Sequence, residues 1–243
     1  MINLNINDIN VNYIDYGVKD GKAIVLLHGW GQNIEMMQMI GEPFKNKYRI
    51  IIVDLPGFGY SDEPKDAIGV DGYTKIIEEL LKRLNVEKPI LVGHSFGGRI
   101  SVKFASRNKV DKLILLSPAL RGHDNNGMKT KILKFLKKVP VINKLETWAK
   151  NHMGSRDYKA ASPIMKKVLV KTVKEDLSLD AIKIKVPTIL IYGDNDSEVP
   201  YEDTKEYERL IDDCGLIIYE NCTHYAYLER LNQTISIIEN FIK

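Results

Sequence analysis

The sequence predicts an α/β fold built on a mostly parallel β-sheet. Two observations indicate this: continuous apolar strands alternate with amphipathic helical segments, and most of these strands end in short polar or glycine-rich loops. Continuous apolar strands are typical of parallel sheets that helices cover on both faces. Because ligands bind at the carboxyl ends of the strands in such sheets, functional residues are expected in the loops that follow them.

The hydrophobic pattern predicts the elements in chain order. Alternating apolar and polar residues at the start indicate a strand pair, 2–6 and 11–16, rather than a signal peptide. Short apolar runs between loops predict further strands at 23–27, 49–53, 90–92, 112–116, 187–192 and 216–219. Helical spacing of apolar residues, such as 76, 77, 80, 81 and 84, predicts helices at 34–47, 73–84, 97–108 and 225–242.

Composition excludes several classes of protein. The 243 residues are 44% hydrophobic, enough for one core with an inserted subdomain. A net charge of +3 is too small to indicate nucleic-acid binding, and no apolar run approaches the roughly 20 residues of a membrane helix. Cys214 and Cys222 form no metal-binding pattern, so we expect free thiols, no metal, no cofactor and a cytoplasmic location.

The strand rhythm stops between 121 and 180, where several short helical stretches replace it. We expect a helical cap subdomain there, above the strand ends, and a core domain formed by 1–120 and 181–243. This segment holds fourteen basic and six acidic residues, a net charge of +8. Its lysines either solvate the outer faces of short helices or attract an anionic substrate or, weakly, an acidic surface.

A serine stands between glycines where the strand 90–92 ends, in Gly93-His94-Ser95-Phe96-Gly97. This spacing suits a sharp strand-to-helix turn whose flanking positions have no room for a Cβ atom. The glycine patterns of dinucleotide sites and P-loops are absent. The turn therefore favours a serine nucleophile, which needs a base, an acid to orient that base, and donors for an oxyanion.

Position selects the candidate base, because His224 follows the last predicted strand on the edge where Ser95 emerges. The acid is expected after the strand 187–192, in the loop GDNDSEVP. Asp194, Asp196 and Glu198 all compete for that role, and the loop residues themselves do not decide between them.

These motifs, together with His28-Gly29-Trp30-Gly31 and DLPGFGYS (54–61), make nearly the whole chain resemble the α/β-hydrolase superfamily. The resemblance implies an eight-stranded, mostly parallel sheet with helices on both faces and a helical cap after the sixth strand. Its G-x-x-D pattern maps the acid onto Asp196, although Thr223 stands where the family usually has glycine before the histidine.

The resemblance also implies roles for the residues around the triad of Ser95, Asp196 and His224. The backbone N–H groups of Trp30 and Phe96 are expected to form the oxyanion hole. The Trp30 ring either lines the acyl pocket or only packs, and the DLPGFGYS loop with its Asp54 is expected to be structural rather than catalytic.

The leading function is a serine hydrolase that cleaves a carboxylic ester of a small or medium acyl substrate through an acyl-enzyme. Gly97-Gly98-Arg99 also resembles the menaquinone-pathway SHCHC synthase, in which such an arginine holds a substrate carboxylate. Structural pairing of Arg99 with a nearby acid is the alternative. A carbon–carbon bond hydrolase with the same triad and a non-catalytic ligand-binding member of the fold remain further alternatives.

Overall fold

The computed structural model describes residues 2–121 and 162–243, whose strands form a single sheet in the order β1-β2-β4-β3-β5-β6-β7-β8. The strands are β1 (Ile2–Ile6), β2 (Ile9–Gly17), β3 (Ala23–Leu27), β4 (Arg49–Val53), β5 (Ile90–His94), β6 (Lys112–Leu116), β7 (Thr188–Gly193) and β8 (Cys214–Tyr219). The pairs β1–β2 and β2–β4 are antiparallel, and every other pair is parallel. The predicted eight-stranded, mostly parallel sheet is therefore confirmed.

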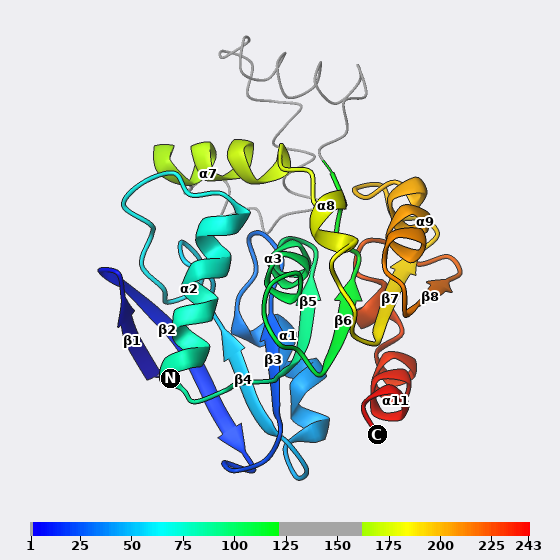
Figure 1. The fold of residues 1–243 in the computed structure, drawn as a ribbon, viewed down its shortest axis with the longest axis horizontal. Helices are drawn as coiled ribbons and strands as arrows, with labels where there is room; N and C mark the ends of the chain where they lie inside the picture. Colours follow the sequence, from blue (N-terminus) through cyan, green and yellow to red (C-terminus); the bar gives the residue numbers. More distant parts are fainter. Residues whose placement is uncertain (1, 122–161) are drawn as a thin grey trace.

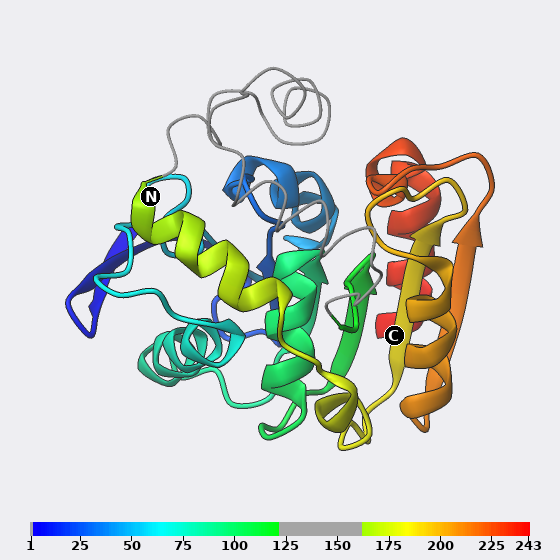
Figure 2. The same cartoon turned by 90° about the horizontal axis from the view of Figure 1, so that it is seen from above.

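Helices cover both faces of the sheet (Figures 1 and 2). One face carries α2 (Val70–Arg83), α3 (Phe96–Ala105), α8 (Ser178–Ala181) and α9 (Tyr201–Leu210). The other carries α1 (Ile34–Gly41), α10 (Ala226–Glu229) and α11 (Leu231–Ile242). The central strands are buried on both sides, as their continuous apolar sequences predicted.

The core divides into two clusters because successive side chains of a strand point to opposite faces. In β3, Val25 and Leu27 belong to the cluster under α2 and α3, whereas Ile24 and Leu26 belong to the cluster under α1 and α11. All four side chains are at most 1% exposed. This two-sided burial fixes the register of the central strands, and with it the positions of the loops at their carboxyl ends.

Three helices differ from the prediction. The predicted helix 34–47 ends at Gly41 and continues as a short 3-10 turn, Glu42–Phe44, because Pro43 has no N–H to continue the α-helical ladder. The predicted C-terminal helix is divided at Arg230 into α10 and α11. No helix was predicted where α9 lies.

A further helix, α7 (Pro163–Val173), crosses the carboxyl-end edge of the sheet above α2 and α3 (Figure 1). Two contacts hold it there: the carboxylate of Glu175 accepts a hydrogen bond from Val70 N, 2.7 Å away, and the Arg99 guanidinium donates to Thr172 O at 3.0 Å. The helix α7 belongs to the predicted cap. Within that cap, 122–161 lie outside the described residues.

Candidate active site

Ser95 stands at the turn from β5 to α3 in a backbone conformation that L residues rarely adopt, with φ 49° and ψ −110°. The two flanking glycines make this turn possible. A Cβ on Gly93 would collide with the Gly97 carbonyl, and a Cβ on Gly97 would collide with the carbonyls of Leu27 and His28. The strained turn places the half-buried Ser95 at the N-terminus of α3, whose dipole favours negative charge nearby.

His224 and Asp196 meet at the ends of the neighbouring strands β7 and β8. The distance from His224 Nδ1 to Asp196 Oδ2 is 2.8 Å, and both side chains are almost fully buried. Gly193 permits this approach, because a Cβ there would strike the Cys222 carbonyl in the loop that carries the histidine. Asp194, the other aspartate of the loop, is exposed.

Asp196 is itself held in place by the backbone. Its Oδ1 accepts hydrogen bonds from Glu198 N at 2.8 Å and Val199 N at 3.0 Å, which leaves Oδ2 for His224. Since a carboxylate only accepts, Nδ1 of His224 carries the proton and Nε2 is the nitrogen available as a base. Burial lowers the pKa of His224, but the hydrogen bond and the charge of Asp196, with Glu198 adding to them, raise it overall.

The loops that carry Ser95 and His224 are tied together through His94. Its Nε2 lies 3.1 Å from the His224 carbonyl oxygen, and the two ring centroids are 5.0 Å apart. In the described part of the chain, no hydrogen bond joins Ser95 Oγ to the His224 ring. The His224 Nε2 lies 3.7 Å from Glu198 Oε2.

The predicted oxyanion donors lie in adjacent segments, because Gly97 N donates to the His28 carbonyl at 3.0 Å. The loop after β3 is further shaped by a hydrogen bond from Gly29 N to Gln32 Oε1 at 2.9 Å. The backbone N–H groups of Trp30 and Phe96 have no acceptor among the described residues. Backbone N–H groups of this kind are suited to bind a developing negative charge.

His28 and Asp54 are structural, as their hydrogen bonds show. His28 Nε2 accepts from Leu55 N at 2.9 Å, so Nδ1 carries the proton and donates to the Gly29 carbonyl. Burial lowers the pKa of His28 to about 4, which keeps the ring neutral. The buried Asp54 carboxylate accepts from Ile34 N, Tyr60 N and the Asn12 amide, and so holds the DLPGFGYS loop against α1.

Aromatic rings form one wall beside the serine turn. The half-buried Trp30 meets Phe58 and Phe96 edge to face, with ring centroids 4.9 and 5.5 Å apart. Tyr73 packs on the other side of Phe96 at 4.9 Å and donates its hydroxyl to the Pro56 carbonyl. The Trp30 ring therefore packs against Phe96, the residue that follows Ser95.

Among the described residues, the hydrogen-bond partners of Arg99 are backbone carbonyls rather than a carboxylate. Its guanidinium is buried and donates to three backbone carbonyls: Ala119 at 2.6 Å, Thr172 at 3.0 Å and Glu175 at 2.5 Å. The last two carbonyls lie at the C-terminal end of α7, where a cation is favoured. Arg99 thus joins α3 to α7, and both of its terminal nitrogens are engaged with the chain.

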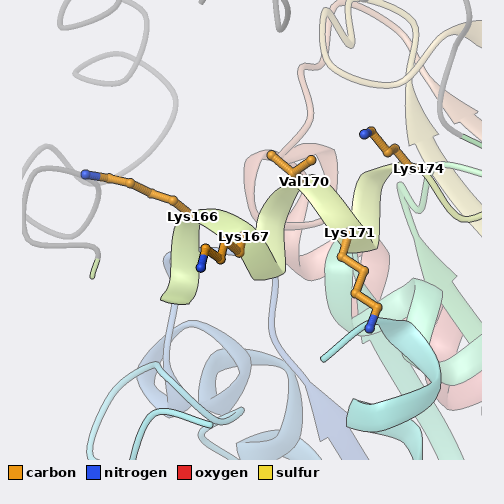
Figure 3. Close-up of a pocket in the computed structure, with 5 residues that line it drawn as sticks. All are labelled: Lys166, Lys167, Val170, Lys171 and Lys174. Atoms are coloured by element: carbon orange, nitrogen blue, oxygen red, sulfur yellow. The ribbon is translucent and has the colours of Figure 1, made fainter. Parts of the chain in front are cut away.

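The surface of α7 carries four of the lysines on which the predicted charge of the cap depends. A hollow on this helix is lined by Val170 and by four lysines: Lys166, Lys167, Lys171 and Lys174 (Figure 3). It includes none of the triad candidates. Among the described residues, no cluster of side chains is suited to hold a metal ion, and no helix is both long and apolar enough to cross a membrane.

Comparison with known proteins bears on the fold. A protein family described as alpha/beta hydrolase fold matches residues 22–141. An AB hydrolase superfamily protein, YisY of Bacillus subtilis, is 29% identical, with 91% of each chain covered. A pimeloyl-[acyl-carrier protein] methyl ester esterase of Aliivibrio fischeri is 24% identical over 92% of this chain and 94% of its own.

Among solved structures, Est816, an N-acyl homoserine lactone degrading enzyme, has a TM-score of 0.81 at 18% identity, covering 99% of this chain and 100% of its own. With the sheet order and the serine turn, these matches show that the chain has the α/β-hydrolase fold.

Two residues beside the candidate site were not predicted from the sequence. His94 and Gln32 were given no role, yet His94 Nδ1 lies 3.1 Å from Gln32 Oε1, and the pair supports the loops of His224 and Gly29. The position of His94 inside the serine motif was the available signal. For Gln32, nothing but its place after the glycine-rich loop pointed to the site.

Proposed function

We propose that the protein is a serine hydrolase that cleaves carboxylic esters of small or medium acyl groups through an acyl-enzyme. One observation carries the proposal: the strained serine turn lies beside a buried Asp196–His224 pair whose free nitrogen is Nε2. The methyl ester esterase among the similar proteins acts on an ester by its name, which supports the ester class.

The mechanism assigns each group one task. Ser95 Oγ attacks the acyl carbon while His224 Nε2 takes its proton, and Asp196 holds the ring and stabilises the imidazolium that forms. The N–H groups of Trp30 and Phe96 bind the oxyanion, each worth about 10²–10³ in rate. His224 then gives the proton to the leaving alcohol, and water releases the acyl group by the same steps in reverse order.

The arrangement of Arg99 bears on the alternatives. The synthase alternative needs a guanidinium that is free to hold a substrate carboxylate, whereas Arg99 is engaged with three carbonyls. A carbon–carbon bond hydrolase would use the same three residues, and a binding protein would use none of their chemistry. The ester and probe experiments below separate these three functions.

The division of the chain remains part of the proposal: a core of 1–120 and 181–243, and a helical cap of 121–180 that covers the site and selects the substrate. Of this cap, 162–180 lie in the described part of the chain. In that part, Met165 of α7 lies against Gly57 in the loop after β4, next to the aromatic wall.

A fluorophosphonate probe tests the proposal directly. We expect one label per chain, located at Ser95 by mass spectrometry, and turnover of p-nitrophenyl esters with a preference for one acyl length. Ser95→Ala is expected to lose both labelling and turnover by several orders of magnitude, because triad members act as a unit. Unlabelled wild-type protein, or Ser95→Ala labelled at the wild-type rate, contradicts the assignment.

A panel of substrates separates the alternatives. Preference for esters over vinylogous diketones favours the esterase, and the reverse preference favours the carbon–carbon bond hydrolase. Silence on both, with a probe that does not react, favours a binding protein.

A further inference from the structure

His224 lies between two carboxylates rather than one. Asp196 Oδ2 is 2.8 Å from Nδ1, and Glu198 Oε2 is 3.7 Å from Nε2 on the opposite side of the ring. The His224 and Glu198 side chains are 5% and 22% exposed, so both are largely shielded from water. The second carboxylate stands at the nitrogen that must exchange a proton with Ser95 and with the leaving group.

The turn after β7 creates this arrangement. The Asp196 carboxylate binds the N–H groups of Glu198 and Val199, which closes the loop on itself. Val199 is then buried, with 5% of its surface exposed, and anchors the segment in the core. The backbone of Glu198 is therefore held by the same aspartate that orients the base, and its side chain reaches the Nε2 side of the ring.

Apart from Asp196 and Glu198, no described group places a charge close to the His224 ring. His94 from β5 faces the ring at 5.0 Å, but burial holds the pKa of His94 well below its usual value, so it is neutral. Tyr225 faces it at 5.7 Å, and burial raises the pKa of Tyr225, so its hydroxyl stays protonated. Glu229 bonds the preceding residue, Thr223, rather than the ring.

We propose that Glu198 is a positioning residue that binds the protonated His224 at Nε2 and so sets the pH below which the base is withdrawn from Ser95. The inference rests on the proposed function, because it matters for activity only if His224 serves as the base.

The charges of Asp196 and Glu198 both favour the protonated form of His224. An imidazolium between two carboxylates is stabilised relative to the neutral ring, and opposite charges within about 4–6 Å act in this direction. Glu198 contributes to the raised pKa of His224, although burial opposes it and Asp196 contributes more. A raised pKa means that the ring is already protonated, and unable to accept the Ser95 proton, at a pH where an ordinary histidine is free.

Removal of the Glu198 charge therefore has two opposite consequences. The base stays unprotonated to lower pH, so the acidic limb of the activity profile moves to lower pH. The plateau at higher pH falls, because a weaker base accepts the Ser95 proton less readily and the imidazolium of the transition state loses a partner. A purely structural role for Glu198 would lower the rate at every pH without moving the limb.

The test measures the rate of fluorophosphonate labelling of Ser95 against pH for wild-type protein and Glu198→Gln. We expect the variant's midpoint at lower pH, a severalfold higher relative rate below the wild-type midpoint, and a lower plateau. Glu198→Asp keeps the charge, so the midpoint of its labelling rate against pH is expected to lie close to that of the wild type. Glu202→Gln is the matched control, since it removes an exposed carboxylate four residues further along.

A second readout does not depend on activity. The ring nitrogens of His224 are titrated by NMR in Ser95→Ala and in Ser95→Ala combined with Glu198→Gln. A lower midpoint in the double variant supports the inference, and equal midpoints in the two proteins overturn it. Unlabelled wild-type protein would reject the proposed function, and the ring titration would still decide whether Glu198 binds the imidazolium.

Discussion

The carboxylate of Asp196 divides its two oxygens between His224 and the backbone. Oδ2 lies 2.8 Å from His224 Nδ1, while Oδ1 accepts the N–H groups of Glu198 and Val199. The aspartate therefore fixes both its own loop and the tautomer of the histidine. The contacts with His224 and with the backbone each need an acceptor, whereas an Asn side chain offers one acceptor oxygen and one NH₂ group that only donates.

The first prediction follows from that division. Asp196→Asn is expected to lower kcat/KM for an ester by about 10³–10⁴-fold, because the His224 tautomer is no longer fixed. Asp194→Asn is the matched control: it makes the same change at an exposed position two residues earlier and is expected to retain near wild-type rates. Steady-state kinetics with a p-nitrophenyl ester measure both, and the reverse ranking would transfer the acid role to Asp194.

The second prediction concerns the glycines of the serine turn. Gly97→Ala places a Cβ against the carbonyls of Leu27 and His28, so we expect a stability loss of roughly 2 kcal/mol or more and slow labelling of Ser95. Gly215→Ala is the control, since the nearest atom to its Cβ is the Ile189 side chain at 3.9 Å. Urea unfolding monitors stability; equal unfolding midpoints for the two variants would show that the turn has room to relax.

The central strands and the serine turn could be predicted from the sequence because their physics is local. Continuous apolar runs fix the strands 23–27, 49–53 and 112–116 to the residue, and two glycines without room for a Cβ mark the turn at Ser95. The position of His224 followed from the topology of a parallel sheet, whose carboxyl ends share one edge.

The missed features depend on contacts between distant residues. The helix α9 has no apolar stripe, because Asp203 and Thr204 share its buried face with Tyr207. The Asp203 carboxylate accepts a hydrogen bond from Leu120 N, which no periodicity reveals. Likewise, the choice of Asp196 over Asp194 depends on which carboxylate the tertiary fold turns toward His224.

The third prediction concerns Arg99 as a link between α3 and α7. Arg99→Met is expected to destabilise the protein by on the order of 2 kcal/mol or more, because three buried carbonyls lose a charged donor. Arg99→Lys is expected to restore only part of this, since a single ammonium cannot reproduce the planar fork. Thermal unfolding at one pH measures both variants.

Kinetics separate this role of Arg99 from substrate binding. If Arg99 only links the two helices, its replacement loosens α7, and we expect KM to change alike for neutral and anionic esters. A guanidinium that holds a substrate carboxylate predicts unchanged stability and a rise in KM for the anionic ester only. The second pattern would restore the synthase-like function.

The fourth prediction concerns the lysine face of α7, formed by Lys166, Lys167, Lys171 and Lys174 (Figure 3). Lys171 also donates to the Ala67 carbonyl, 3.2 Å away, so part of this face has a structural task. If the face attracts anionic substrates, kcat/KM for an anionic ester falls as salt rises, by up to about tenfold, while that for a neutral ester of equal acyl length stays constant. Exposed charges act only within about 10 Å at 0.1 M salt, so the loss is complete at moderate ionic strength.

A pair of double variants assigns the salt effect to this face rather than to the net charge of the protein. Lys166→Ala with Lys167→Ala is expected to abolish most of the salt dependence for the anionic ester and to leave the neutral ester unchanged. Lys82→Ala with Lys109→Ala removes the same charge from two exposed positions, one in the last turn of α2 and one in the segment between α3 and β6, and is expected to keep the wild-type salt dependence. Salt-dependent kinetics of the wild-type protein and the two double variants with both esters, together with binding to acidic vesicles, decide the matter. If both esters respond to salt alike in the wild-type protein, and the vesicles bind no protein, the α7 lysines have no role beyond solvation of the helix and the Lys171 contact with Ala67.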